Sequence, residues 1–445
     1  MSTTPIVYLS FDRFPSPKGA ATHIDAFVRA LGNRFGNVTL LTIPSEAVEL
    51  ARRAADPPRY PIRLTRRWTV DGSSAPDWSA TGVTHRTFDA PGQQFFERVL
   101  SFRSQIWMWW QRQFGEGLKT LPIVHFRSIF EGYPIARHKP RFCRQLVFEV
   151  NGLPSIELKY RYPRCAEDRE LSRKLKAQEQ VCLDAADLIL TVSQVNAEHL
   201  RRRGVAADRI RVIPNGVDAD LFAYRSPSLD GANSALPLRM LYSGTLSSWQ
   251  GVGLAIEALA LYRRDFPATL TLVGHARPHQ KRDLIQHAWD QGVHESVQLL
   301  DPVSRSALAA LHHQADVIVA PLTRNDRNLV QGCCPLKVLE AMASGTPLIA
   351  SDLPVVRELA IDDREALLVR PGSAKAIKDG MLRLARENGL ARRLSEAARQ
   401  RVEQNFTWTR AQQALTTAYD DLLVGSSALD NLANSAVSRV ASTSD

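Results

Sequence analysis

The part of the sequence that most restricts the fold is residues 331–352, QGCCPLKVLEAMASGTPLIASD. Its proline suits the first turn of a helix, where the N–H that proline lacks has no intrahelical partner. Leu336, Leu339 and Ala343 then recur at helical spacing, and a glycine precedes the apolar run LIA. The segment therefore predicts a short amphipathic helix followed by a buried strand, as in an α/β domain.

One face of this predicted helix carries Lys337, Glu340 and Ser344. A lysine in the first turn opposes the positive end of the helix dipole, so it is favourable there only when an anion such as a phosphate docks on that end. A carboxylate one turn later can accept hydrogen bonds from a pair of ligand hydroxyls. The pattern indicates a sugar nucleotide, although a solvated Lys–Glu pair on an ordinary amphipathic helix would explain it equally well.

Helix-like and strand-like segments alternate through most of the 445 residues, which is enough chain for two large domains. A stretch rich in Ser, Pro, Gly and Asn at residues 226–237 interrupts the alternation. We predict an N-terminal domain at residues 1–225, a second domain at residues 236–404 and a disordered tail at residues 425–445. Residues 52–94 are rich in Arg, Pro and Ser and predict long loops. The strands of both domains are expected to end at a shared cleft.

Polar side chains follow two strand-like runs of the N-terminal domain. His125, Arg127 and Glu131 lie at the end of one run, and Glu149 and Asn151 lie at the end of the next. In open α/β sheets, ligands bind beyond the carboxyl ends of the strands. We therefore assign both groups to a binding site, with Glu149 and Asn151 as catalytic candidates. For His125, a structural role in its strand is the leading alternative.

The first strand-like run leads into a loop of small residues that contains Gly19 and opens onto a helix. A strand, a glycine-containing loop and a helix form the opening unit of a nucleotide-type α/β domain. The loop has no G-x-G-x-x-G pattern, so the sequence does not support a dinucleotide cofactor.

The net charge of +10 is unevenly distributed. Residues 1–225 contain 33 Lys and Arg against 23 Asp and Glu, whereas residues 226–445 contain 23 of each. A basic N-terminal half favours anionic partners such as a membrane surface or a lipid-linked phosphate. Nucleic acid is not expected, because no recognised binding motif accompanies the charge. A solvated basic surface without a partner is the remaining interpretation.

Residues 95–114 predict a helix with Trp107, Trp109 and Trp110 among several arginines. Adjacent aromatic and basic side chains are able to contact a bilayer interface. Packing of the tryptophans in the protein core is the favoured alternative.

Neither a signal peptide nor an apolar run approaching the ~20 residues that span a bilayer is visible. The five cysteines include no CxxC pair, which favours reduced thiols over disulfides or a zinc site. These features indicate a cytoplasmic protein, with peripheral attachment to the inner face of the membrane as an open alternative.

Several segments together resemble the retaining family-4 glycosyltransferases, which have the two-domain GT-B fold. The matching segments are VIPNGVDADLF (212–222), LTLVG (270–274), ADVIVAPL (315–322) and PLKVLEAMASGTPLIASDLPVVREL (335–359). NFTW (405–408) resembles the start of the family's last helix, which implies that residues 406–424 return to the N-terminal domain. The resemblance covers roughly the first 424 residues. EVNGLPSIELKYRYP (149–163), GTLSSWQGV (244–252) and RNDRNLVQGCCPLK (324–337) resemble one subgroup of the family.

The resemblance implies an α/β protein of the GT-B class, with two Rossmann-like βαβ domains facing each other across a cleft. The C-terminal domain would bind a nucleotide-diphosphate sugar as substrate, without a metal ion or other cofactor. The N-terminal domain would bind a polysaccharide, a lipid-linked sugar or another cell-surface glycan, and the anomeric configuration would be retained. Synthesis of a soluble small glycoside and a catalytically silent sugar-nucleotide-binding scaffold are the alternatives.

The resemblance also implies donor-binding residues. Glu340 matches the second acid of the family's E-x7-E motif, which binds the ribose hydroxyls. The backbone at Leu336 and Lys337 would hold the diphosphate, and Gly244 and Thr245 would approach it from the first loop of the second domain. Gly274 lies where backbone groups contact the base, and we add Gly19 of the N-terminal domain to this set.

Four positions, in three motifs, depart from the family pattern. The first acid of E-x7-E is replaced by Gly332, and the paired basic residues of the first loop are replaced by Thr245 and Gln250. The family's histidine in a V-H-G-L-like pattern corresponds to Asn151.

The loss of the basic pair at Thr245 and Gln250 removes positive charge that a departing diphosphate requires. We expect Lys337, which we count as catalytic, to supply it together with Arg324 and Arg327.

Overall fold

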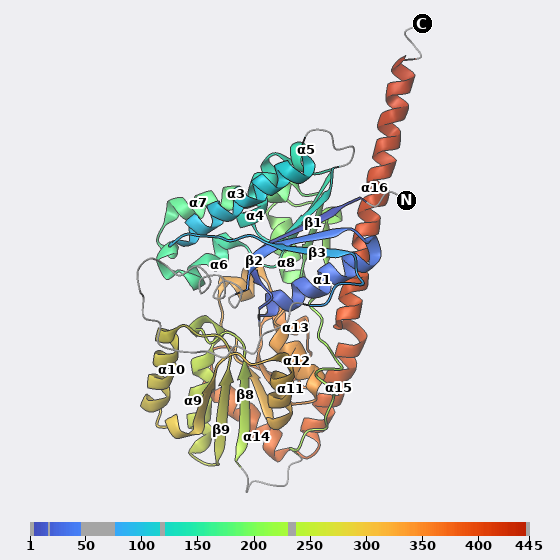
Figure 1. Cartoon of the computed structure of the whole chain (residues 1–445). Helices are drawn as coiled ribbons and strands as arrows, with labels where there is room; N and C mark the ends of the chain where they lie inside the picture. The colour runs from blue at the N-terminus through green and yellow to red at the C-terminus, as the bar shows by residue number, and fades with distance from the viewer. Residues whose placement is uncertain (1–3, 17, 46–75, 116–120, 230–236, 442–445) are drawn as a thin grey trace.

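The computed structural model describes residues 4–16, 18–45, 76–115, 121–229 and 237–441, with side chains up to residue 424. Two parallel sheets, one in each half of the chain, form the centres of two α/β domains (Figure 1). The predicted α/β class and the two Rossmann-like domains are confirmed.

The N-terminal sheet has seven parallel strands in the order β3-β2-β1-β4-β5-β6-β7. The strands are β1 (Ile6–Phe14), β2 (Val38–Pro44), β3 (Val83–Thr87), β4 (Ile123–Phe126), β5 (Gln145–Val150), β6 (Leu188–Thr191) and β7 (Ile210–Val212). β3 corrects the prediction of loops alone at residues 52–94. It is a half-exposed edge strand with a polar sequence, VTHRT, and therefore lacks the apolar run that marks a buried strand. Residues 52–75 lie outside the described residues.

Helices cover both faces of this sheet. They are α1 (Gly19–Phe35), α3 (Phe95–Phe114), α4 (Ile129–Arg137), α5 (Lys139–Phe142), α6 (Pro154–Arg161), α7 (Arg169–Ala185) and α8 (Gln194–Arg202), with short turns η1 (Pro163–Ala166) and η2 (Ala207–Arg209). Alternate residues of β1 point to the two helical layers on opposite faces of the sheet. Val7 and Leu9 pack in the core beneath α3, α4 and α7, whereas Ile6 and Tyr8 pack in the core beneath α1.

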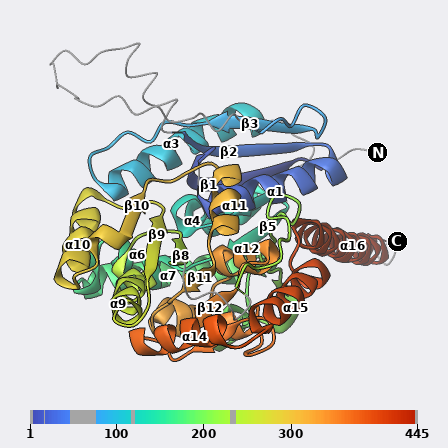
Figure 2. The ribbon, with the colours of Figure 1, turned by 90° about the horizontal axis from the view of Figure 1, so that it is seen from below.

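The C-terminal sheet has six parallel strands in the order β10-β9-β8-β11-β12-β13. They are β8 (Leu238–Ser243), β9 (Ala268–Val273), β10 (Val297–Leu300), β11 (Val317–Ala320), β12 (Leu348–Ser351) and β13 (Leu367–Val369). The helices around the sheet (Figure 2) are α9 (Val252–Arg263), α10 (Pro278–Asp290), α11 (Arg305–Gln314), α12 (Leu336–Ser344), α13 (Pro354–Arg357), α14 (Ala374–Arg386) and α15 (Leu390–Asn405). Three short turns complete the domain: η3 (Ser248–Gln250), η4 (His294–Ser296) and the π-helical η5 (Arg327–Gln331).

The last helix, α16 (Trp408–Ala441), returns to the N-terminal domain. Its buried Leu415 and Tyr419 join the core beneath α1, and Arg34 of α1 forms an ion pair of 3.0 Å with Asp420. The backbone remains helical to Ala441, and the end of the helix projects beyond the domain (Figure 1). The tail that we predict to be disordered, residues 425–445, thus has a helical backbone as far as residue 441, and residues 442–445 lie outside the described residues. A segment rich in Ala, Leu and Ser satisfies its own backbone hydrogen bonds in a helix even when its composition is polar.

Candidate active site

The first turn of α12 presents backbone N–H groups at the boundary between the domains. Pro335 occupies the N-cap position, and the turn has neither a side-chain cap nor an acidic residue. A β-carbon added to Gly19, at the start of α1, would lie 2.7 Å from Leu336 Cδ1, so the first loop of the N-terminal domain touches this helix end. Free N–H groups and the helix dipole both favour a bound anion.

Lys337 places a second positive group beside this helix end. Its Nζ donates to Tyr242 Oη at 2.8 Å and to Gln250 Oε1 at 3.3 Å, and it lies 4.1 Å from the centre of the Tyr242 ring. Burial, aided by the charge of Arg327, lowers the pKa of Lys337 to about 7. A neighbouring anion would raise that pKa again, because it favours the charged ammonium.

Glu340 lies one helical turn after Lys337, as the sequence predicts. Burial raises the pKa of Glu340 to about 7, although Arg305 and Lys337 act in the opposite direction. A carboxyl group in this position accepts hydrogen bonds in its ionised form and also donates one in its protonated form.

Two glycines allow the strand ends of the C-terminal domain to approach Lys337. Gly244 has φ +128°, and a β-carbon there would lie 2.9 Å from Lys337 Nζ. Gly274 has φ +150°, and its β-carbon would lie 1.8 Å from the carbonyl oxygen of Gly244. Only glycine adopts this backbone without strain. Of the predicted first-loop residues, Gln250 is buried against Lys337, whereas the Thr245 side chain is exposed.

Glu149, at the end of β5, is the centre of a polar cluster in the N-terminal domain. Its side chain is 1% exposed. Oε1 lies 2.8 Å from Arg127 Nε and 3.0 Å from His23 Nε2, and Oε2 lies 2.6 Å from Tyr8 Oη and 3.0 Å from His125 Nε2. Although burial alone would raise the pKa of Glu149, His23 and Arg127 hold it well below its usual range. The cluster therefore holds a permanent carboxylate.

The same cluster includes the predicted Asn151, and it connects the predicted His125 to α16. Asn151 Nδ2 donates to Glu149, and His125 Nδ1 lies 2.7 Å from Tyr419 Oη on α16. Sequence reasoning missed His23, whose Nδ1 lies 2.7 Å from Asn215 Oδ1. One feature of the sequence could have indicated His23: its position in the first turns of the helix that follows the Gly19 loop.

Glu131 does not join this cluster. Its Oε1 accepts from the backbone N–H groups of Arg127 and Ser128, at 3.1 and 2.7 Å, which completes the capping box of α4. The side chain is 1% exposed, and burial raises its pKa to about 8. A helix cap explains this acid without a ligand.

Three of the quoted subgroup segments meet at the domain boundary. Glu157 of α6 accepts from Arg327 Nε and from Gln331 Nε2, both at 2.8 Å. Gln331 Oε1 accepts from the backbone N–H of Leu153 at 2.8 Å. Tyr160 stacks on Trp249 with ring centres 5.4 Å apart. Arg327 is therefore fixed across the boundary with its charge paired, whereas Arg324 is exposed.

The structure explains why residue 332 is a glycine and not the acid of the family motif. Its φ is +86°, and a β-carbon there would lie 2.5 Å from both Asn196 N and Ser193 Oγ at the start of α8. The backbone of η5 packs so closely on the N-terminal domain that no side chain fits at this position.

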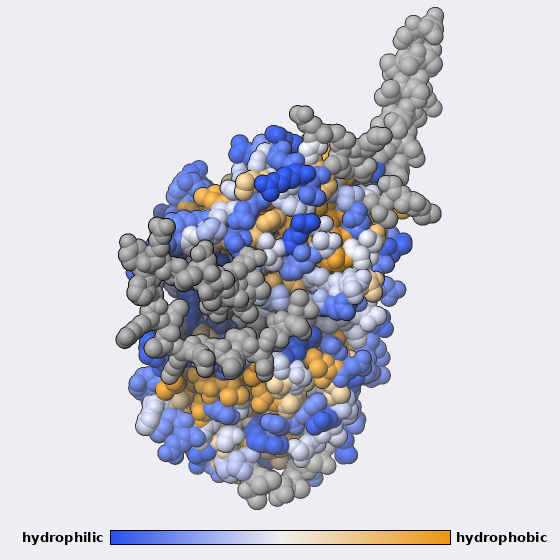
Figure 3. Space-filling view, in the orientation of Figure 1, coloured by the Kyte–Doolittle hydropathy of each residue, from blue (hydrophilic) through white to orange (hydrophobic). Residues whose placement is uncertain are grey.

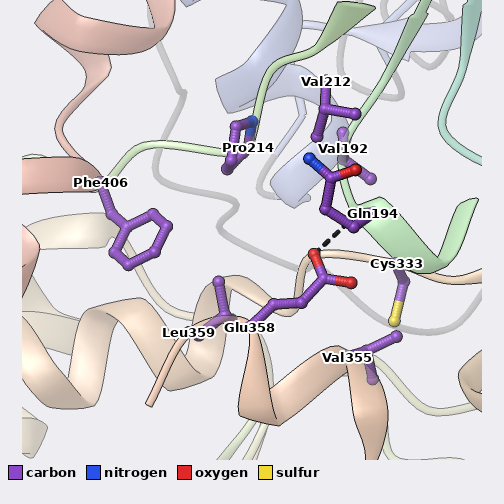
Figure 4. A pocket seen from close by; sticks show the side chains of 9 residues that line it. All are labelled: Val192, Gln194, Val212, Pro214, Cys333, Val355, Glu358, Leu359 and Phe406. Atoms are coloured by element: carbon purple, nitrogen blue, oxygen red, sulfur yellow. Dashed lines mark hydrogen bonds between the residues drawn. The ribbon is translucent and has the colours of Figure 1, made fainter. Parts of the chain in front are cut away.

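A cavity of about 210 Å³ also lies between the domains (Figure 4). Its lining residues are Val192, Gln194, Val212, Pro214, Cys333, Val355, Glu358, Leu359 and Phe406, and none of them is a predicted site residue. Glu358 accepts from the backbone N–H groups of Gln194 and Val195 at 2.8 and 2.9 Å. An apolar cavity whose charged group is a carboxylate is unsuited to a diphosphate.

Within the described ranges, no group of His, Cys, Asp and Glu side chains is arranged to hold a metal ion. Among the described residues, no helix combines the length and apolar character needed to cross a membrane.

Residues 17–221 match the family model described as "Glycosyltransferase Family 4", and residues 235–401 match "Glycosyl transferases group 1". A glycogen synthase of Mycobacterium tuberculosis is 31% identical over 253 residues, which cover 56% of this chain and 58% of that protein. A D-inositol 3-phosphate glycosyltransferase of Xylanimonas cellulosilytica is 30% identical over 252 residues, covering 54% and 58%. The chain thus spans less than two thirds of these relatives.

The fold is that of solved glycosyltransferases with GT-B architecture. Sucrose-phosphate synthase from Thermosynechococcus elongatus superposes with a TM-score of 0.70 at 20% identity, covering 95% of this chain and all of that one. HepE of Anabaena, solved in complex with UDP and glucose, gives 0.68 at 16% identity, covering 94% of this chain and all of that one.

Proposed function

Because both domains match glycosyltransferase family models and the fold is GT-B, we propose that this chain transfers a sugar from a nucleotide-diphosphate sugar to a glycan or lipid-linked acceptor. The observation that carries the proposal is the first turn of α12. It combines uncapped N–H groups, the half-buried Lys337 and the Glu340 carboxyl at one end of a helix. These groups complement a diphosphate followed by a ribose.

We further propose that the reaction retains the anomeric configuration and uses no metal ion. Lys337 and the α12 N–H groups would stabilise the negative charge that develops on the departing diphosphate. The acceptor proton would pass to that diphosphate oxygen. Glu149 supports a route without a protein base, because its oxygens already contact Tyr8, His23, His125 and Arg127. We therefore reassign Glu149 and Asn151 as positioning residues.

A small anionic acceptor is a second candidate, since one relative is a D-inositol 3-phosphate glycosyltransferase. The basic N-terminal half suits a phosphate on a small molecule as well as on a lipid. Transfer of radiolabelled sugar to water-soluble phosphorylated acceptors, compared with a lipid extract, separates the two candidates.

The first test is a thermal-shift screen with UDP, GDP, ADP, TDP and their sugars. A ligand that binds only the native state raises its melting temperature, so one nucleotide is expected to give a clear shift. Glu340→Ala should abolish the shift. Glu257→Ala, a partly exposed glutamate on α9, is the matched control and should keep it. Absence of any shift would contradict the donor site, and a shift without transfer or donor hydrolysis would favour a silent scaffold.

A further inference from the structure

Helix α3 is apolar on two faces. Val99, Phe102, Ile106, Trp109 and Trp110 are buried in the core of the N-terminal domain. Four large apolar side chains lie outside it: Phe96, Leu100, Trp107 and Met108 are 38, 60, 40 and 50% exposed. At ~100° per residue, these four fall within about 120° of the helix circumference. We call them the α3 stripe. Core packing is thus confirmed for Trp109 and Trp110 but is incomplete for Trp107.

Helix α3 lies on the outside of the N-terminal domain, where it packs beside α4 (Figure 1). Figure 3 shows apolar residues among hydrophilic ones over this part of the molecule. Scattered single apolar residues are normal on a protein surface, but four along one helix face indicate a partner.

The charge around the stripe is positive. Helices α3, α4 and α5 contain Arg98, Arg103, Arg112, Arg137, Lys139 and Arg141 against Glu97 and Glu131, and Lys139 forms an ion pair with Asp187. Of the two glutamates, Glu131 is buried. The Arg141 guanidinium lies 5.0 Å from the centre of the Trp107 ring, and Arg112, Arg137 and Arg141 are exposed. Phosphate-bearing surfaces attract such a cationic border.

We propose that the α3 stripe docks the N-terminal domain on an anionic lipid bilayer. The four apolar side chains enter the boundary between headgroups and acyl chains, while the arginines contact lipid phosphates. Tryptophan beside a cation is suited to this depth, because its ring is apolar and its edge is polar. A second copy of the chain fits less well, since a two-fold contact through this helix would oppose two positive borders.

This docking is independent of donor chemistry and would bring the N-terminal domain to the bilayer. The test therefore uses purified full-length protein, without donor or acceptor, and vesicles of phosphatidylcholine with or without phosphatidylglycerol. Co-sedimentation is expected only with the anionic vesicles and should decrease as salt is added.

Two double variants test the surface itself. Leu100→Glu with Met108→Glu should weaken vesicle binding at least about ten-fold, because charges replace inserted apolar groups. Arg112→Gln with Arg141→Gln should weaken it by about five-fold per cation. The matched control is Ile285→Glu with Trp289→Glu, which alters two residues of α10 that are 49 and 56% exposed, and it should bind as the wild type does.

The melting temperature of each variant, measured without ligand, shows whether its fold is intact. The proposal is overturned if anionic vesicles do not bind the wild type, or if the α3 variants bind normally. Equal loss in the α10 control would also overturn it, because binding would then be non-specific. If Leu100→Glu with Met108→Glu instead converts a dimer into a monomer in light scattering, the stripe belongs to a second copy.

Discussion

Binding of a nucleoside diphosphate should couple to proton uptake by Lys337. In the ligand-free protein, burial lowers the pKa of this lysine to about 7, and its hydrogen-bond partners are the neutral oxygens of Tyr242 and Gln250. A diphosphate at the α12 end would favour the ammonium form and raise the pKa. The lysine must therefore gain a proton on binding whenever the pH is above 7.

The size of the effect follows from that pKa. If the bound lysine stays protonated throughout, affinity should fall about 25-fold between pH 6.5 and 8.5, and about 0.9 proton should be taken up at pH 8. Affinity must fall as the pH rises, because Lys337 loses its proton in the free protein but keeps it in the complex. Ionisation of the diphosphate itself also changes the affinity in this pH range. The contribution of Lys337 is therefore measured by comparing the wild type with a Lys337 variant.

Isothermal titration calorimetry in buffers of different ionisation enthalpy measures both quantities. Lys337→Met should weaken binding at pH 6.5 and should lack the proton uptake that is due to the lysine. Lys337→Arg keeps its charge at every pH and should show the profile of the nucleotide alone. Identical pH profiles for the wild type and Lys337→Met would refute the reasoning.

Two further predictions concern the domain cores and the boundary. Glu149→Gln keeps the shape of the side chain but removes the buried anion beside Arg127, which then has only the partly exposed Asp12 as an ion-pair partner, at 2.9 Å. Urea unfolding should therefore show a loss of about 3 kcal/mol; a loss below about 1 kcal/mol would contradict the fixed-carboxylate role. Gly332→Glu, which restores the family's acid, should cost at least about 1–2 kcal/mol because of its left-handed backbone. Gly332→Ala should cost a similar amount, and a Glu variant with unchanged stability and faster turnover would disprove the steric explanation.

Local patterns in the sequence were sufficient for the α/β class, the two domains and the helix with Lys337 and Glu340 on one face. These features follow from periodicity and from glycine and proline positions, which act over a few residues. The sequence could not show that Glu131 serves as a cap, since an acid three residues after a serine fits a site and a capping box equally well. The sequence also did not indicate β3, because this edge strand is polar and has no apolar run.

Only the tertiary structure decided which groups meet. Tyr8 and Glu149 are 141 residues apart in the chain, and His125 and Tyr419 are 294 apart, yet each pair is hydrogen-bonded. Gly332 lacks a side chain because the start of α8, from the other domain, occupies that space. Such contacts depend on how two sheets and their helices pack, and packing between distant segments leaves no periodic signal in the sequence.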